Sequence, residues 1–170
     1  MAQNPVRLFL LIGVTASGKS TFAAMLADRM DATYIDADDH HPPANIAKMA
    51  AGIALTDADR WPWLDAVAAQ MMIPSGLVFI SCSALRKRYR KYLTSRVGMP
   101  LHFIYLDADR SLIAKRMAAR DGHFMPLRLI DSQFAALEVP DVHEAASHID
   151  VKASKPVVID RILAAITPLI

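Results

Sequence analysis

Residues 13–20, which read Gly-Val-Thr-Ala-Ser-Gly-Lys-Ser, decide the fold of this chain. They match the phosphate-loop pattern G-x-x-x-x-G-K-[ST], with glycines where the backbone must bend and approach a ligand closely. In this pattern the lysine reaches the β- and γ-phosphates of a nucleotide, and the serine hydroxyl can bind Mg²⁺. We expect the phosphates to contact Gly13, Ala16, Ser17, Gly18, Lys19, Ser20 and Thr21.

The segments on either side of the loop support this interpretation. Residues 6–12 form a short, nearly unbroken apolar run, as expected for a strand that is buried on both faces. Residues 21–30 carry apolar side chains at helical spacing, so a helix would direct its free N–H groups at the phosphates. The alternative is a turn rich in glycine and serine that matches by accident, but the strand–loop–helix context favours phosphate binding.

The rest of the chain continues the alternation of strands and helices. Further strands are expected at 32–36, 77–82, 102–106 and 149–151, and helices at about 43–52, 57–72, 84–96, 109–121, 126–138 and 157–166. Asp57 or Asp59 is the expected cap of the second of these helices. The pattern predicts an α/β protein, the three-layer fold of the P-loop kinases, with a five-stranded parallel sheet, helices on both faces and a small lid.

Length and composition restrict the class of protein. The 170 residues predict a single domain, with ligands beyond the carboxyl ends of the strands. Although 54% of residues are hydrophobic, no apolar run approaches the ~18–20 residues of a membrane span. The single cysteine, Cys82, excludes an internal disulfide and favours a reducing compartment. A net charge of +2, without long basic runs, does not indicate nucleic-acid binding.

Two acids after the second strand are the main catalytic candidates. The sequence lacks the Asn-Lys-x-Asp of a GTPase, and the third strand ends without a carboxylate that could help to bind Mg²⁺. Asp36 is therefore the expected metal partner of Ser20. Asp38 lies on the same side of an extended segment and is expected to take the proton from a substrate hydroxyl. The alternative is that both acids only cap or solvate a loop.

Basic residues and one histidine are expected near the same cleft. Arg60, Lys87 and Arg90 follow strand ends or open helices, and they are candidates for an anionic substrate. A solvated helix face is the competing interpretation for each of them. His41 is expected to hydrogen-bond the substrate, because no further Cys or His cluster supports a metal site there.

A second basic pair indicates a lid. Arg116 and Arg120 are four residues apart, and Gly122 comes two residues after Arg120. Two guanidinium groups beside a glycine hinge are typical of a lid that closes over a transferring phosphate, and Arg120 is the expected catalytic arginine. The alternative is again a solvated surface. The lid is expected to span about 116–137, and the substrate-binding region about 37–64.

Taken in order, these blocks resemble those of the P-loop gluconate kinases (gluconokinases), relatives of shikimate kinase and the nucleoside monophosphate kinases. The resemblance covers roughly residues 8–150. It depends on the phosphate loop, the Asp-Ala-Asp block with His41 and Asn45, and segments 55–64, 82–90, 120–125 and 132–140. The chain departs from the family at Thr15-Ala16, where Ser-Gly is usual, and this predicts that the backbone at Ala16 avoids positive φ.

The resemblance implies ATP- and Mg²⁺-dependent phosphorylation of D-gluconate at its terminal hydroxyl, by a cytoplasmic homodimer. The predicted site residues agree with such a substrate. The cations Arg60, Lys87 and Arg90 suit its carboxylate, and the polar groups of Asp38, His41 and Asn45 suit its hydroxyls. By analogy with the family, Arg116 is expected near the adenine. A kinase of another small hydroxy acid, such as shikimate, is one alternative. A nucleotide-binding regulatory module without transferase activity is another.

Overall fold

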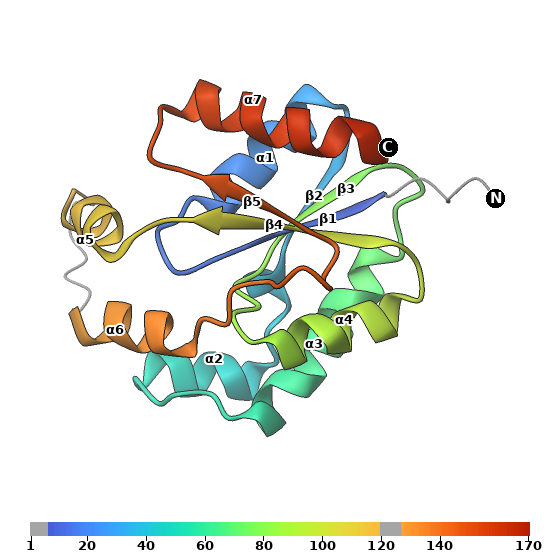
Figure 1. The fold of residues 1–170 in the computed structure, drawn as a ribbon. Helices are drawn as coiled ribbons and strands as arrows, with labels where there is room; N and C mark the ends of the chain where they lie inside the picture. The colour runs from blue at the N-terminus through green and yellow to red at the C-terminus, as the bar shows by residue number, and fades with distance from the viewer. Residues whose placement is uncertain (1–6, 120–126) are drawn as a thin grey trace.

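A computed structural model describes residues 7–119 and 127–170. A five-stranded parallel sheet, in the order β2-β3-β1-β4-β5, lies between two layers of helices (Figure 1). The strands are β1 Leu8–Ile12, β2 Thr33–Asp36, β3 Val78–Ser81, β4 Leu101–Asp107 and β5 Ala146–Asp150. The helices are α1 Lys19–Arg29, α2 Pro43–Ala50, α3 Asp57–Met71, α4 Lys87–Val97, α5 Arg110–Ala118, α6 Leu127–Ala136 and α7 Lys155–Ile166, with 3-10 helices η1 Ala37–His40 and η2 Thr167–Leu169. The expected α/β fold with five parallel strands is confirmed.

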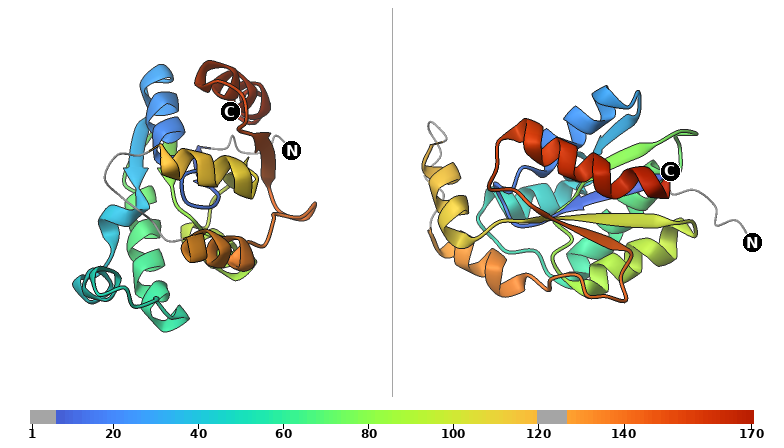
Figure 2. Two further views of the ribbon diagram at one scale, coloured as in Figure 1. Left: turned by 90° about the vertical axis from the view of Figure 1, so that its left-hand side faces the viewer. Right: turned by 45° about the horizontal axis from the view of Figure 1, so that its top comes forward.

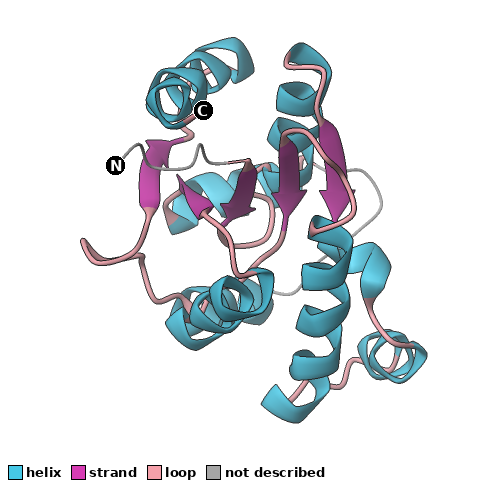
Figure 3. Cartoon of the chain, turned by 90° about the vertical axis from the view of Figure 1, so that its right-hand side faces the viewer, coloured by secondary structure: helices cyan, strands magenta, loops and turns pink. Residues whose placement is uncertain are grey.

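The two faces of the sheet bury separate apolar clusters, because successive side chains of a strand point to opposite faces. Phe9 and Leu11 of the central strand β1 pack in the cluster that includes α1 and α7. Leu8 and Leu10 pack in the cluster that includes α3 and α4. Figure 3 shows the strands in a row between these layers. Within the described ranges, no helix has both the length and the apolar character needed to cross a membrane.

The strand register brings the carboxyl ends of the strands to one edge of the sheet. Asp36 at the end of β2 pairs with Ser81 at the end of β3, and Ser81 pairs in turn with Leu11 of β1. Figure 2 (left) looks at this edge directly. Parallel α/β sheets bind their ligands there, so this edge is where the predicted site residues are to be sought.

Several element boundaries differ from the sequence-based expectation. Helix α4 begins at Lys87 instead of near residue 84, because Ala84 is left-handed (φ 36°) and Arg86 is extended. Helix α3 is capped by Thr56, not by an aspartate: its hydroxyl accepts from the Asp59 N–H at 3.3 Å, and Asp59 Oδ2 accepts from the Thr56 N–H at 2.8 Å. Strand β5 begins three residues earlier than expected and spans Ala146–Asp150.

Candidate active site

The phosphate loop connects β1 to α1, and its glycines are required by its geometry. Gly13 and Gly18 have φ of 149° and 105°. A Cβ on Gly13 would lie 3.0 Å from Ser17 Oγ, and one on Gly18 would lie 2.7 Å from the Phe22 ring. Gly18 precedes α1 without a side-chain cap, so the first N–H groups of the helix have no capping side chain at this end. Such a loop and helix start together form an anion-binding site.

Ala16 corrects one expectation, because its backbone is left-handed, with φ of 57°. Arg116 holds this part of the loop. Its Nη1 donates to the carbonyl oxygens of Ala16 (3.3 Å) and Ser17 (2.9 Å), and its Nη2 donates to that of Val151 (2.6 Å). The predicted nucleotide contact Arg116 therefore lies against the phosphate loop, where its guanidinium binds protein carbonyl groups.

Two further side chains contact the loop. Lys19 Nζ donates to the Val14 carbonyl at 2.9 Å, which places the ammonium across the loop. Gln133 of α6 accepts from the Thr15 N–H at 2.9 Å, a contact that joins residues 118 positions apart. Sequence reasoning assigned no function to Gln133, although the block 132–134 contributed to the family resemblance. Ser17 is fully buried, and its hydroxyl has no hydrogen-bond partner among the residues that the structure describes.

Asp36 lies beside the loop and is held by three groups. Its Oδ2 accepts from Ser20 Oγ at 3.4 Å and from the Tyr34 hydroxyl at 3.1 Å, and its Oδ1 accepts from the Asp38 N–H at 3.1 Å. Tyr34 also shares a hydrogen bond with Ser81 Oγ at 3.0 Å. Tyr34 was missed as a site residue, although alternation along β2 places it on the same side as Asp36.

Oxygen ligands for Mg²⁺ are therefore adjacent. The Ser20 hydroxyl and the Asp36 carboxylate are of the type that Mg²⁺ prefers, and they are within hydrogen-bond distance of each other. Among the described residues, no group of three or more His, Cys, Asp or Glu side chains is arranged to hold a metal ion. A small set of protein ligands fits a Mg²⁺ ion that is held mainly by phosphate oxygens and water.

Asp38 and His41 face each other at the start of the substrate region. His41 Nε2 lies 3.8 Å from Asp38 Oδ1; the Asp38 side chain is 81% exposed and that of His41 only 6%. Desolvation by the surrounding protein and the negative charge of Asp36 raise the pKa of the Asp38 carboxyl, while the charges of His41 and Lys19 oppose the shift. Burial lowers the pKa of His41, against the charge of Asp38. Asp38 therefore faces His41, and the charge of Lys19 reaches its carboxylate.

Arg60 is a predicted substrate cation that acts on this pair. Its charge acts on His41, whose pKa it helps to lower. Its Nη1 donates to the Tyr89 hydroxyl at 3.2 Å and lies 3.8 Å from Asp57 Oδ1. The side chain remains 31% exposed, so the guanidinium can still meet an anion from solvent.

Three other predicted substrate residues are engaged within the protein. Arg90 is 1% exposed; it forms a bidentate pair with Glu144 at 2.6 and 2.9 Å and also donates to the carbonyl groups of Ala84 and Leu85. Lys87 Nζ pairs with Asp141. Asn45 is 3% exposed and uses its Nδ2 on protein acceptors. This geometry does not support direct substrate binding by Arg90 or Asn45, because both are buried.

The remaining predictions concern the lid. Arg120 and the hinge at Gly122 lie outside the described residues. Helix α5 ends at Ala118 and α6 begins at Leu127, so these two helices flank that segment. Thr21, which was predicted to contact the phosphates and is not part of the lid, lies exposed in the first turn of α1.

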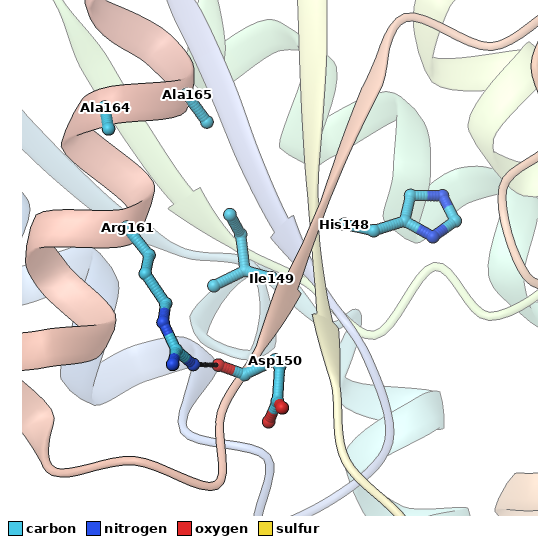
Figure 4. A pocket seen from close by; sticks show the side chains of 6 residues that line it. All are labelled: His148, Ile149, Asp150, Arg161, Ala164 and Ala165. Atoms are coloured by element: carbon cyan, nitrogen blue, oxygen red, sulfur yellow. Dashed lines mark hydrogen bonds between the residues drawn. The ribbon is translucent and has the colours of Figure 1, made fainter.

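A surface pocket lies away from these groups, at the edge of the sheet (Figure 4). It is lined by residues of β5 and α7, namely His148, Ile149, Asp150, Arg161, Ala164 and Ala165. Arg161 there donates to the Asp150 carbonyl at 2.9 Å. None of the predicted site residues that the structure describes lines it, so the chemistry is assigned to the phosphate loop and its neighbours.

A phosphate loop on the central parallel strand, with one carboxylate at its serine and a second near its lysine, defines a P-loop kinase site. Comparison with known proteins agrees with this class. A family profile described as an AAA domain matches residues 8–140. The thermosensitive gluconokinase of Escherichia coli is 45% identical over 140 residues, which cover 80% of this chain and 74% of that protein.

Other relatives extend over more of the chain. The gluconokinase of Gluconobacter oxydans is 38% identical and covers 92% of this chain and 89% of its own. The crystal structure of a gluconokinase from Sinorhizobium meliloti matches with a TM-score of 0.88 at 37% identity, covering 99% of this chain and 95% of that one. The chain therefore belongs to the gluconokinase family of small-molecule kinases.

Proposed function

We propose that this protein transfers the γ-phosphate of ATP to the terminal hydroxyl of D-gluconate, giving 6-phospho-D-gluconate and ADP. The observation that carries the proposal is that Asp38 is connected to the phosphate loop, since its N–H donates to Asp36 Oδ1 (3.1 Å) and Asp36 Oδ2 accepts from Ser20 Oγ (3.4 Å), in a chain that is 45% identical to a gluconokinase. The acceptor hydroxyl gives its proton to Asp38 as its oxygen bonds to the γ-phosphorus, and the bond from that phosphorus to the β–γ bridging oxygen breaks. ADP leaves with that oxygen.

The phosphate loop and its neighbours supply alignment and charge. The amides of residues 16–21 and the Lys19 ammonium hold the phosphates, and Arg116 and Arg120 complete the nucleotide side. Ser20 and Asp36 would hold Mg²⁺, which when bound neutralises phosphate charge. Residues 116–137 form the lid in this proposal, and 37–64 form the substrate region.

The sugar acid is recognised mainly by Arg60, Asp38 and His41. Arg60 remains partly exposed and suits the gluconate carboxylate. Lys87 is 34% exposed and can join it by exchanging Asp141 for the substrate. Arg90 and Asn45 support the site without contacting the substrate, because both are buried and their polar groups form hydrogen bonds with protein atoms.

We further propose that the protein acts in the cytoplasm as a homodimer. The family resemblance supports the dimer. Burial raises the pKa of the Cys82 thiol to about 12, and this free cysteine suits a reducing compartment.

The test is ADP release with gluconate, with shikimate and without acceptor. We expect turnover with gluconate well above both other reactions; release no greater than without acceptor would refute the substrate assignment. Asp38→Asn should lower kcat about 10²–10⁴-fold while the protein still binds ATP. Asp39→Asn is the matched control, because it removes the same charge one residue away. ATP binding by the wild type without turnover on any acceptor would instead support a regulatory module.

A further inference from the structure

Asn45 is oriented by the backbone of α3. Its side chain is 3% exposed, and Nδ2 donates to the Asp59 carbonyl oxygen at 2.9 Å. A carbonyl oxygen can only accept a hydrogen bond, so the amino end of the Asn45 amide must face it. The amide therefore has one stable orientation.

This orientation determines the tautomer of His41. The same Nδ2 atom lies 3.3 Å from His41 Nδ1. An amino group can only donate, so His41 Nδ1 must carry the lone pair, and the ring proton of the neutral imidazole is on Nε2. Nε2 is the atom that lies 3.8 Å from Asp38 Oδ1. The only N–H of the ring thus faces the carboxylate proposed as the catalytic base.

Trp63 holds both members of this pair. Its Nε1–H donates to the Ala37 carbonyl at 2.7 Å, which fixes the turn that carries Asp38. Its ring stacks on His41 with centroids 4.2 Å apart and an angle of 14° between the planes. The imidazole can therefore neither tilt freely nor turn over without losing the contacts with Trp63 and Asn45.

We propose that Asn45 is a positioning residue for phosphoryl transfer, and that it acts by holding His41 in the Nε2–H tautomer that faces Asp38. This rests on the proposed function. When His41 moves the short distance needed to donate to Asp38 Oδ1, the second carboxylate oxygen remains for the acceptor hydroxyl. The Asn45 amide also opposes protonation of His41, because an imidazolium would bring an N–H against the amino group. Burial of the ring lowers its pKa in the same direction.

The tautomer can be measured directly by long-range ¹H–¹⁵N NMR on the full-length protein without substrates. The His41 signal is assigned by its loss in His41→Gln. We expect a lone-pair Nδ1 and a protonated Nε2 in the wild type. Asn45→Leu should give a mixture of tautomers, and Asn45→Asp, whose carboxylate accepts from Nδ1, should shift the proton to Nδ1. A wild-type Nδ1–H tautomer would overturn the proposal even if neither variant folds.

Kinetics provide the second measurement. Asn45→Leu should lower kcat with gluconate by about 2–10-fold, the effect of one neutral hydrogen bond, and leave the KM for ATP unchanged. Ser147→Ala is the matched control: it removes the 2.9 Å contact to another mostly buried histidine, His102, outside the site. Equal kcat in the wild type and Asn45→Leu, with a changed tautomer, would refute the positioning role. Absence of gluconate turnover in the wild type would instead refute the proposed function, whatever the tautomer.

Discussion

Replacing Arg90 with methionine tests whether this arginine is structural or binds substrate. Arg90 is buried, and its guanidinium donates to both oxygens of Glu144 and to the carbonyl groups of Ala84 and Leu85. The Glu144 side chain is only 9% exposed. Arg90→Met keeps most of the apolar stem but leaves a buried carboxylate without its cation.

The expected loss follows from the burial of both partners. Removing one member of a buried ion pair costs about 3–5 kcal/mol of unfolding free energy. With a urea m-value of about 2 kcal/mol per molar, the unfolding midpoint should fall by about 2 M. The exposed pair Arg29–Asp160, at 3.4 Å with side chains 57% and 67% exposed, should contribute about 0–1 kcal/mol. Arg29→Met is therefore the matched control.

The assay is urea unfolding of the wild type and both variants, followed by the KM for gluconate under conditions where each is folded. The double variant Arg90→Met/Glu144→Leu should recover part of the lost stability, because it removes the unpaired carboxylate. If Arg90→Met unfolds at the same midpoint as Arg29→Met and raises the KM for gluconate, the ion pair is not structural. The substrate role predicted from the sequence would then be correct.

Three further outcomes are expected. Gln133→Leu removes the acceptor of the Thr15 N–H. Titration with ATP should show an affinity changed by several-fold, while the unfolding midpoint stays the same. An unchanged ATP affinity would exclude a role of this contact in nucleotide binding. Hydrogen bonds from Lys48 and Thr56 lower the pKa of Asp59 to about 2. The contribution of this carboxylate to stability should therefore be complete above pH 4 and disappear as the pH falls towards 2. In urea unfolding at a series of pH values, Asp59→Asn should remove that part of the acid dependence. Ala16→Gly should change the unfolding free energy by less than about 1 kcal/mol, because relief of the positive φ and the greater freedom of the unfolded chain oppose each other. Ala16→Val should destabilise the protein clearly in the same urea measurement.

The parts of the fold that are determined by local pattern could be predicted from the sequence. The phosphate loop is a contiguous motif, and the apolar run before it can only be a buried strand in such a context. The position of Asp36 beside Ser20 could also be predicted, because parallel strands end at one edge of the sheet. These features depend on spacing along the chain, which the sequence displays.

The burial of polar side chains could not be predicted in the same way. Arg90 was predicted to bind the substrate because it follows the end of a strand, but its partner Glu144 is 54 residues away. Asn45 was assigned to a sugar hydroxyl, but a carbonyl of α3 occupies its amino group. Neither partner is implied by local periodicity. Only the packing of distant segments decides whether such a group meets solvent or protein.

The same reasoning explains the backbone at Ala16. A left-handed alanine costs about 1–2 kcal/mol, and this cost is the basis for expecting glycine at such a position. In the folded chain, however, the Arg116 guanidinium, 100 residues away, donates to the carbonyl groups of Ala16 and Ser17. Charge-assisted hydrogen bonds of this kind contribute about 1.5–3 kcal/mol each, enough to offset the strain. Since Arg116 lies on α5 and Gln133 on α6, and both residues fall within the predicted lid (116–137), the shape of the phosphate loop depends on helices of the predicted lid itself. Movement of either helix would therefore alter the loop that binds the phosphates.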